Sequence, residues 1–168
     1  AASDALLVLG ASEDVDLAKL LMALLASPQP HVRRTASQLA STMKGGRKLT
    51  DELLNSLRTE DWWVRERVLD AIVELGLPEL ANGLVRFLSD ELPTIRRCAV
   101  FGLLRLRDPA TLGALLGTAA ADPEWWVREQ AIQAIGVLGD ERAVPYLEAL
   151  VRERPDLRVA SLESLALL

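Results

Sequence analysis

The residues that most often carry out chemistry in proteins are scarce in this sequence. It contains one histidine, His31, and one cysteine, Cys98. A metal site built from several imidazoles is therefore excluded, and a cysteine nucleophile would need a base brought close by folding. We expect His31 to be a solvated residue at a helix start and Cys98 to be half buried and unreactive. No pair of carboxylates stands out for acid–base catalysis.

The segment Lys44–Lys48 reads KGGRK and resembles a phosphate-binding loop in composition. It lacks both the G-x-x-x-x-G-K-[ST] spacing and a preceding strand. Its glycines fit a turn between two helices, with the alternative that its three cations hold an anion at the next helix start. We therefore predict no catalytic residue, no metal and no cofactor, and we interpret the chain as not being an enzyme.

The composition indicates helices that pack on one another. Half of the 168 residues are apolar but only 4% are aromatic, which suits helices better than strands. The net charge of −5 argues against partners such as nucleic acid or anionic lipid. One cysteine excludes an internal disulfide framework and fits a reducing compartment, so we expect a cytoplasmic protein. No stretch reaches the roughly 18 consecutive apolar residues that a membrane span requires, so we expect no membrane-inserted segment.

The elements that must position any site are repeated along the chain. Residues 61–76 and 124–139 are identical at nine of sixteen aligned positions and start 63 residues apart. More generally, a branched apolar anchor followed by arginine recurs after 32, 31, 32 and 30 residues. The anchors are Val32, Val64, Ile95, Val127 and Leu157. Such self-similarity is typical of repeat architectures.

Each anchor opens an amphipathic helix. Apolar or small residues follow the anchor at offsets 4, 7, 8 and 11, which form one stripe on a helix of 3.6 residues per turn. A turn signal such as Gly139-Asp140 and a second, shorter apolar pattern come next. The repeating unit is thus helix, tight turn, helix. We expect a single domain over 1–168, with a half unit at 1–26, units at about 27–58, 59–89, 90–121 and 122–153, and a partial unit at 154–168.

The start of the helix that follows residue 121 is also marked. Asp122 is expected to be the N-cap, with Pro123 at the first helical position and Glu124 in the first turn.

Residues 122–150, DPEWWVREQAIQAIGVLGDERAVPYLEAL, resemble a HEAT repeat of the short, phycobilisome-lyase-like type. The resemblance is good over 61–88, looser elsewhere, and spans nearly the whole chain. It implies an all-α, armadillo-type fold, a right-handed α-solenoid of stacked helix–turn–helix repeats. It also implies that the arginine after each anchor pairs with acids or carbonyls where neighbouring units meet. These arginines are Arg33, Arg65, Arg96, Arg128 and Arg158.

Tryptophan pairs mark every second unit. The resemblance implies that Trp62 and Trp125 close the gap between successive units. Trp63 and Trp126 lie beside the anchors but off the buried stripe, so we expect their rings to be partly exposed. Two readings stay open for them: packing on the preceding loop, or anchoring a partner, since tryptophan is enriched at interface hot spots.

These features favour an interaction scaffold that binds another protein or peptide on its concave surface or tryptophan-bearing edge. The second helices are expected to present Asp51, Asn55, Asn82, Arg86, Tyr146 and Glu148 to that partner. The alternatives are a bilin lyase-like subunit that handles a chromophore, which the resemblance includes, and a nucleic-acid-binding HEAT-like protein. Because both ends are apolar rather than capped, we expect a fragment of a longer chain, with end-to-end self-association as the alternative.

Overall fold

The computed structural model describes residues 17–29, 31–33, 35–36, 54, 57, 61–75 and 81–168, and the regular structure of these residues is helical. Contacts divide the chain into two compact units, Ala1–Leu80 and Ala81–Leu168. Neighbouring hairpins of a repeat array contact one another far more than distant ones, so a division by contacts does not test whether the chain is one domain. The expectation of one domain over the whole chain stays a prediction.

In the first unit, helix α2 (Leu17–Leu25) packs against helix α5 (Trp62–Leu75). Val64 and Val68, the anchor of α5 and the residue one turn later, are buried, as the predicted stripe requires. Arg67 of α5 donates a hydrogen bond of 3.3 Å from Nη1 to the carbonyl of Ala26, just after α2. The polar end of this side chain thus ties the two helices together.

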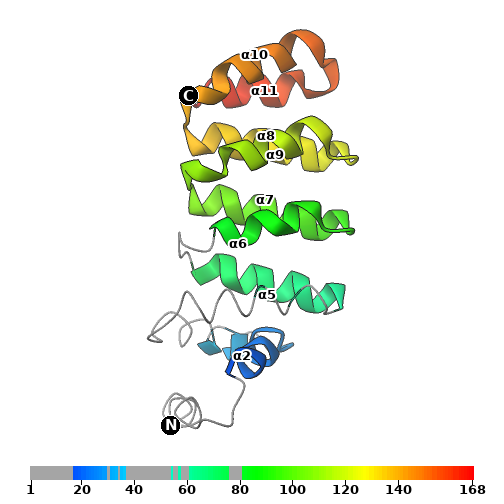
Figure 1. Ribbon diagram of the computed structural model, residues 1–168, viewed down its shortest axis with the longest axis vertical. Coiled ribbons are helices and arrows are strands. Elements are labelled where there is room, and N and C mark those ends of the chain that lie inside the picture. Colours follow the sequence, from blue (N-terminus) through cyan, green and yellow to red (C-terminus); the bar gives the residue numbers. More distant parts are fainter. Residues whose placement is uncertain are drawn as a thin grey trace. The chain divides into compact units, whose positions relative to one another are not determined.

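The second unit is built from two kinds of helix that alternate along the chain (Figure 1). In the repeats at 90–121 and 122–153, the first helix has 14 residues and follows the inter-repeat loop, and the second helix follows a 3₁₀ turn. The first helix of the final partial repeat is shorter, with 8 residues, and follows the 3₁₀ helix η6 (Pro155–Leu157). The first helices are α7 (Pro93–Leu106), α9 (Trp125–Leu138) and α11 (Arg158–Leu165). The second helices are α6 (Ala81–Val85), continued by the 3₁₀ helix η3 (Arg86–Ser89), then α8 (Leu112–Ala121) and α10 (Val144–Glu153).

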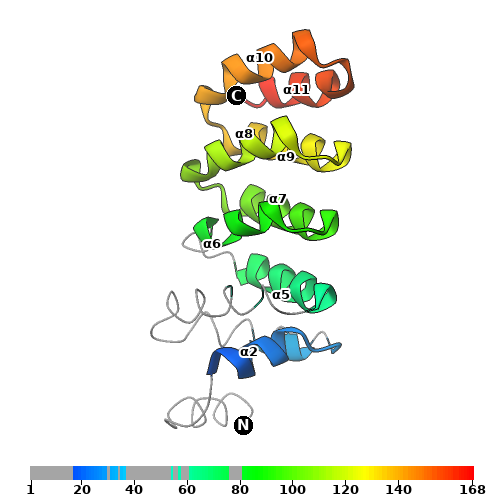
Figure 2. The same ribbon diagram turned by 45° about the vertical axis from the view of Figure 1, so that its right-hand side comes forward.

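Packing within the second unit follows the predicted stripe. Helix α9 contacts both α7 and α11, and each first helix also packs on the second helix that precedes it (Figure 2). The anchors Ile95, Val127 and Leu157 are all buried at these contacts. The prediction of an all-α fold made of stacked helix–turn–helix repeats is therefore confirmed.

The turns inside the two repeats at 90–121 and 122–153 have the same cap. Asp108 accepts a hydrogen bond from the backbone N–H of Ala110 (2.9 Å), and Asp140 accepts one from Arg142 (3.0 Å), so each aspartate starts a 3₁₀ turn, η4 (Pro109–Thr111) or η5 (Glu141–Ala143). The residue before the aspartate is left-handed in both: Gly139 has φ 73° and Arg107 has φ 50°. Glycine adopts this conformation freely, whereas arginine does so at a steric cost.

The inter-repeat loop differs from the sequence prediction at one point. Helix α9 begins at Trp125 and its N-cap is Glu124, so Asp122 is not the N-cap residue. The Asp122 carboxylate instead accepts a hydrogen bond from the N–H of Glu124, two residues later, at 2.9 Å. Asp90 makes the same contact with the N–H of Leu92 before α7. Each of these aspartates closes a turn in the loop just before the helix. Aspartate side chains commonly stabilise turns in this way.

Candidate functional site

The arginine after the anchor holds the loop that leads into its own helix in three of the repeats. In three repeats its Nη1 donates to the carbonyls of the residues six and five positions earlier, at 2.8–3.3 Å. Arg33 binds Ser27 and Pro28, Arg96 binds Asp90 and Glu91, and Arg128 binds Asp122 and Pro123. Arg65 is buried at the equivalent position of α5. The guanidinium thus satisfies carbonyls that the turn leaves without helical partners.

Arg96 also reaches the next repeat. Its Nε and Nη2 donate to the two carboxylate oxygens of Asp122 at 2.7 and 2.9 Å, and only 7% of each residue is exposed. This hydrogen bond, more than any other factor, raises the pKa of Arg96 above its ordinary value. Two-point pairing between guanidinium and carboxylate fixes direction as well as distance. The pair therefore sets how α7 meets the segment that leads into α9.

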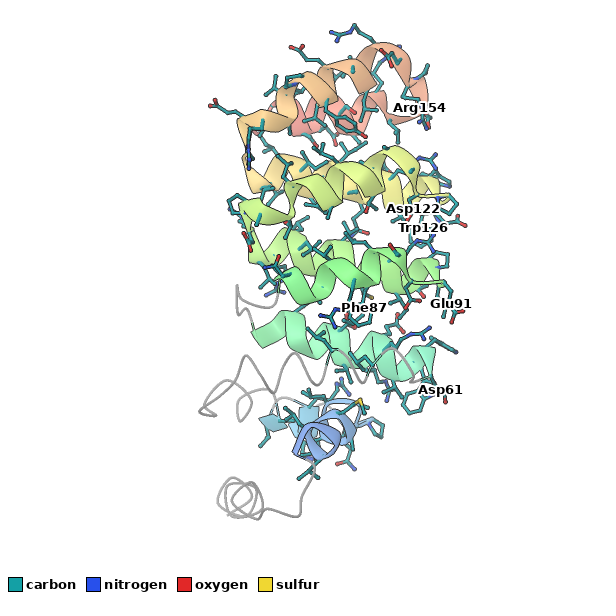
Figure 3. The ribbon with its side chains drawn as sticks, in the orientation of Figure 1. Asp61, Phe87, Glu91, Asp122, Trp126 and Arg154 are labelled. Carbon is teal, nitrogen blue, oxygen red and sulfur yellow. The ribbon has the colours of Figure 1, made fainter. Side chains whose placement is uncertain are left out.

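The last junction is built differently. Arg128 lies 3.5 Å from Asp156, but Arg154 already binds this carboxylate through two hydrogen bonds of 3.0 and 2.9 Å. Arg158 donates to the carbonyl of Val151 rather than to an acid. The acids Asp122 and Asp156 lie in the segments where one repeat passes to the next. Figure 3 shows Asp122 and Arg154 at the same end of the second unit. The inter-repeat role of these arginines stays a prediction that the geometry supports.

A groove of about 480 Å³ lies where η3 faces α8, beside the buried pair of Arg96 and Asp122. Its walls are largely apolar or small: Val85, Leu88, Ala114, Gly117, Ala121 and Pro123. Ser89, Asp90, Arg96, Thr118 and Asp122 supply its polar atoms. Because Arg96 and Asp122 satisfy each other, the groove offers shape and apolar surface rather than an activated acid or base.

The predicted partner-binding residues fall on several elements. Asn82 in α6 and Arg86 in η3 are exposed on the segment that carries the groove walls Val85 and Leu88. Tyr146 and Glu148 lie on α10, where the Tyr146 hydroxyl donates to the carbonyl of Leu116 at 3.4 Å and burial raises its pKa. Asp51 and Asn55 lie outside the described residues. The structure therefore places Asn82 and Arg86 on the segment that contributes Val85 and Leu88 to the groove, and Tyr146 and Glu148 two repeats further on.

The tryptophans are more exposed than their predicted packing role implies. In Trp62 and Trp125, 53% and 62% of the residue is accessible, against 43% in Trp63. At most one face of the first ring of each pair can therefore pack between repeats. Trp63 and Trp126 each lie under an arginine, Arg67 at 5.7 Å and Arg97 at 5.8 Å from the ring centre.

The two cation–π pairs are not equivalent. Arg67 is one turn along the same helix as Trp63, whereas Arg97 of α7 reaches Trp126 of the next first helix. A signal for the second pair is present in the sequence, because an Arg-Arg dipeptide stands one repeat before each tryptophan pair. The equivalent of Arg97, Arg34, lies outside the described residues.

The residues considered first for chemistry are not brought together. His31 is exposed and Cys98 is buried in α7, while Lys44–Lys48 lies outside the described residues. Within the described part of the chain, no three side chains among His, Cys, Asp and Glu gather as a metal site would require. No helix among the same residues has the length and apolarity needed to cross a bilayer.

Stacked helical hairpins, a periodic arginine and an open groove place the chain among the helical-repeat proteins, whose stacked units present extended surfaces. A family model described as HEAT repeats matches residues 17–99 and 81–166. The chain belongs to the HEAT-repeat family, as the motifs predicted.

Among curated proteins, the chain is similar to the bilin biosynthesis protein PecE of Mastigocladus laminosus, with 32% identity over 108 residues. The aligned part covers 64% of this chain and 40% of PecE. This relative agrees with the predicted resemblance to HEAT repeats of the phycobilisome-lyase-like type. The chain spans well under half of the length of this relative.

Proposed function

We propose that this protein is a non-catalytic scaffold that binds a partner protein in the groove between η3 and α8. The groove carries the proposal, because its apolar walls surround a buried ion pair that needs no further ligand. Such a surface suits an apolar side chain of a partner, anchored in a small pocket with polar groups around it. One cysteine among 168 residues fits a cytoplasmic location, which is part of the proposal.

The small residues of α8 shape how close a partner can approach. A Cβ atom added at Gly113 or Gly117 would meet nothing within 4 Å, so both positions face open space. Gly117 and Ala114 line the groove, whereas Gly113 does not. A partner helix or extended segment can therefore bring its backbone close to α8.

Replacing Gly117 with leucine is expected to block the groove without disturbing the fold, because Gly117 lines the groove and a Cβ added there meets nothing within 4 Å. Partner protein captured from the native cell extract on the immobilised chain should bind at least about tenfold more weakly, the effect of losing one buried apolar anchor. Dissociation constants measured by biolayer interferometry would give the ratio.

The matched control is Gly113→Leu, the same change one turn earlier on the same helix and outside the groove. It should leave the affinity within about twofold, well under the tenfold that 1.4 kcal/mol represents. Equal affinity of the Gly117→Leu variant and the wild type would show that the partner binds elsewhere, and joint replacement of Asn82, Arg86 and Tyr146 would then test the wider concave surface.

The likeness to PecE favours a second candidate, in which the chain handles a bilin. A bound bilin would change its absorbance spectrum on mixing with the protein. A stoichiometric change that is lost in the Gly117→Leu variant would favour bilin handling in the groove over partner binding. No spectral change at micromolar concentrations would exclude this candidate.

A further inference from the structure

A second surface of this unit combines exposed aromatic and cationic side chains. Arg97, Phe101 and Arg105 follow one another at intervals of four residues along α7, so they lie on one face of the helix. All three are exposed, and Phe101 is 44% accessible although it is a large apolar residue. Trp126 of α9 lies under Arg97 and extends this surface onto the next repeat.

The arginines on this face are available to a ligand. Within the described part of the chain, the Arg97 side chain interacts with the Trp126 ring alone, and the Arg105 side chain has no hydrogen bond, ion pair or ring contact with another residue. Stacking uses the flat face of a guanidinium and leaves the N–H groups at its edge free to donate to a carboxylate. Arg97 is therefore held in place by Trp126 with its donors still open.

A shallow depression of about 280 Å³ adjoins the stacked pair. It is lined by Arg97, Trp126, Glu129, Gln130 and Gln133. The two glutamine amides can both donate to and accept from a peptide backbone. Glu129 is the one acidic residue of this lining, so an uncharged residue of a ligand is expected beside it.

We propose that the face formed by Arg97, Phe101, Arg105 and Trp126 binds an acidic segment of a partner protein, with an aromatic or large aliphatic residue of that segment packed on Phe101. Charge complementarity is the reason for proposing an acidic partner. Two cations separated by an exposed phenylalanine stand out on a chain of net charge −5, and they match carboxylates that flank one apolar residue. This surface is separate from the groove and does not depend on the function proposed for it.

The test is fluorescence anisotropy of the full chain with a short fluorescein-labelled peptide in which glutamates flank one phenylalanine. Arg97→Ala, Arg105→Ala and Phe101→Ala should each weaken binding about tenfold, as expected for the loss of one charged or apolar anchor. Because these side chains are exposed, circular dichroism should show unchanged folding. A peptide with serine in place of the phenylalanine should also bind about tenfold more weakly.

Two variants separate this surface from general charge effects and from the groove. Arg142→Ala removes the same charge beyond the far end of α9, from an exposed pair with Asp140, and should leave peptide affinity within about twofold. Gly117→Leu should also leave it unchanged. Absence of peptide binding, equal binding of the serine peptide, or insensitivity to Phe101→Ala would overturn the proposal. So would tighter binding of a single-stranded oligonucleotide, or a dimer of the chain that Phe101→Ala dissociates.

Discussion

Replacing Asp122 with alanine is expected to lower the free energy of unfolding by about 3 kcal/mol, the lower end of the range for breaking a buried ion pair. Arg96 would keep its buried position, with 7% of the residue exposed, but would lose both charged hydrogen bonds. An uncompensated buried charge costs more than the pair itself contributes. Urea denaturation followed by circular dichroism would measure the loss.

The exposed pair between Asp140 and Arg142 gives the matched control, because Asp140 likewise caps a turn and binds an arginine. Asp140→Ala should cost much less, since water can replace its contacts. Asp122→Asn separates the charge from the cap, because asparagine can still accept the hydrogen bond from the N–H of Glu124. A loss for Asp122→Ala no larger than that for Asp140→Ala would show that the Arg96–Asp122 pair does not hold the junction.

Replacing Gly136 with alanine should destabilise the protein by about 2 kcal/mol, within the range for overpacking a core. The added carbon would lie 2.7 Å from Cα and 2.8 Å from Cβ of Ser164, so the backbones of α9 and α11 would have to separate. That movement would also strain the hydrogen bond of 2.8 Å from the Ser164 hydroxyl to the carbonyl of Ile132. Thermal unfolding would show the loss, and hydrogen exchange would show reduced protection in α11.

Gly113→Ala provides the comparison, because an added carbon at Gly113 in α8 would meet nothing within 4 Å. Alanine is favoured over glycine inside a helix by about 1 kcal/mol, so this variant should be as stable as the wild type or more so. The prediction would be wrong if both alanine variants unfolded at the same temperature and α11 kept its exchange protection.

Two contacts show which parts of the fold could be predicted from the sequence: the Arg96–Asp122 ion pair and the close approach of Gly136 to Ser164. The spacing of the anchors Val64, Ile95 and Val127 predicted where helices form and which residues they bury, because a helix repeats every 3.6 residues wherever it packs. The close approach of Gly136 to Ser164 could not be predicted in this way, since it depends on how far one hairpin is rotated against the next. Asp122 was expected to be the N-cap of the following helix, which it is not. The resemblance implied that Arg96 pairs with an acid or a carbonyl where repeats meet, but it did not identify Asp122 as that acid.

The candidate surfaces divide along the same line. Asn82 and Arg86 were predicted on the second helices, but the groove depends on the spacing between η3 and α8. Trp126 was predicted to be partly exposed, whereas its contact with Arg97 requires α7 and α9 to lie side by side.

The sequence by itself determined the helices, their buried faces, the repeat and the family, because these follow from local periodicity and motif. Only the tertiary structure decided which charged, aromatic and small residues of different repeats meet. Those meetings are set by the distance and rotation between stacked hairpins, which arise from side-chain packing along the whole interface rather than from any one segment.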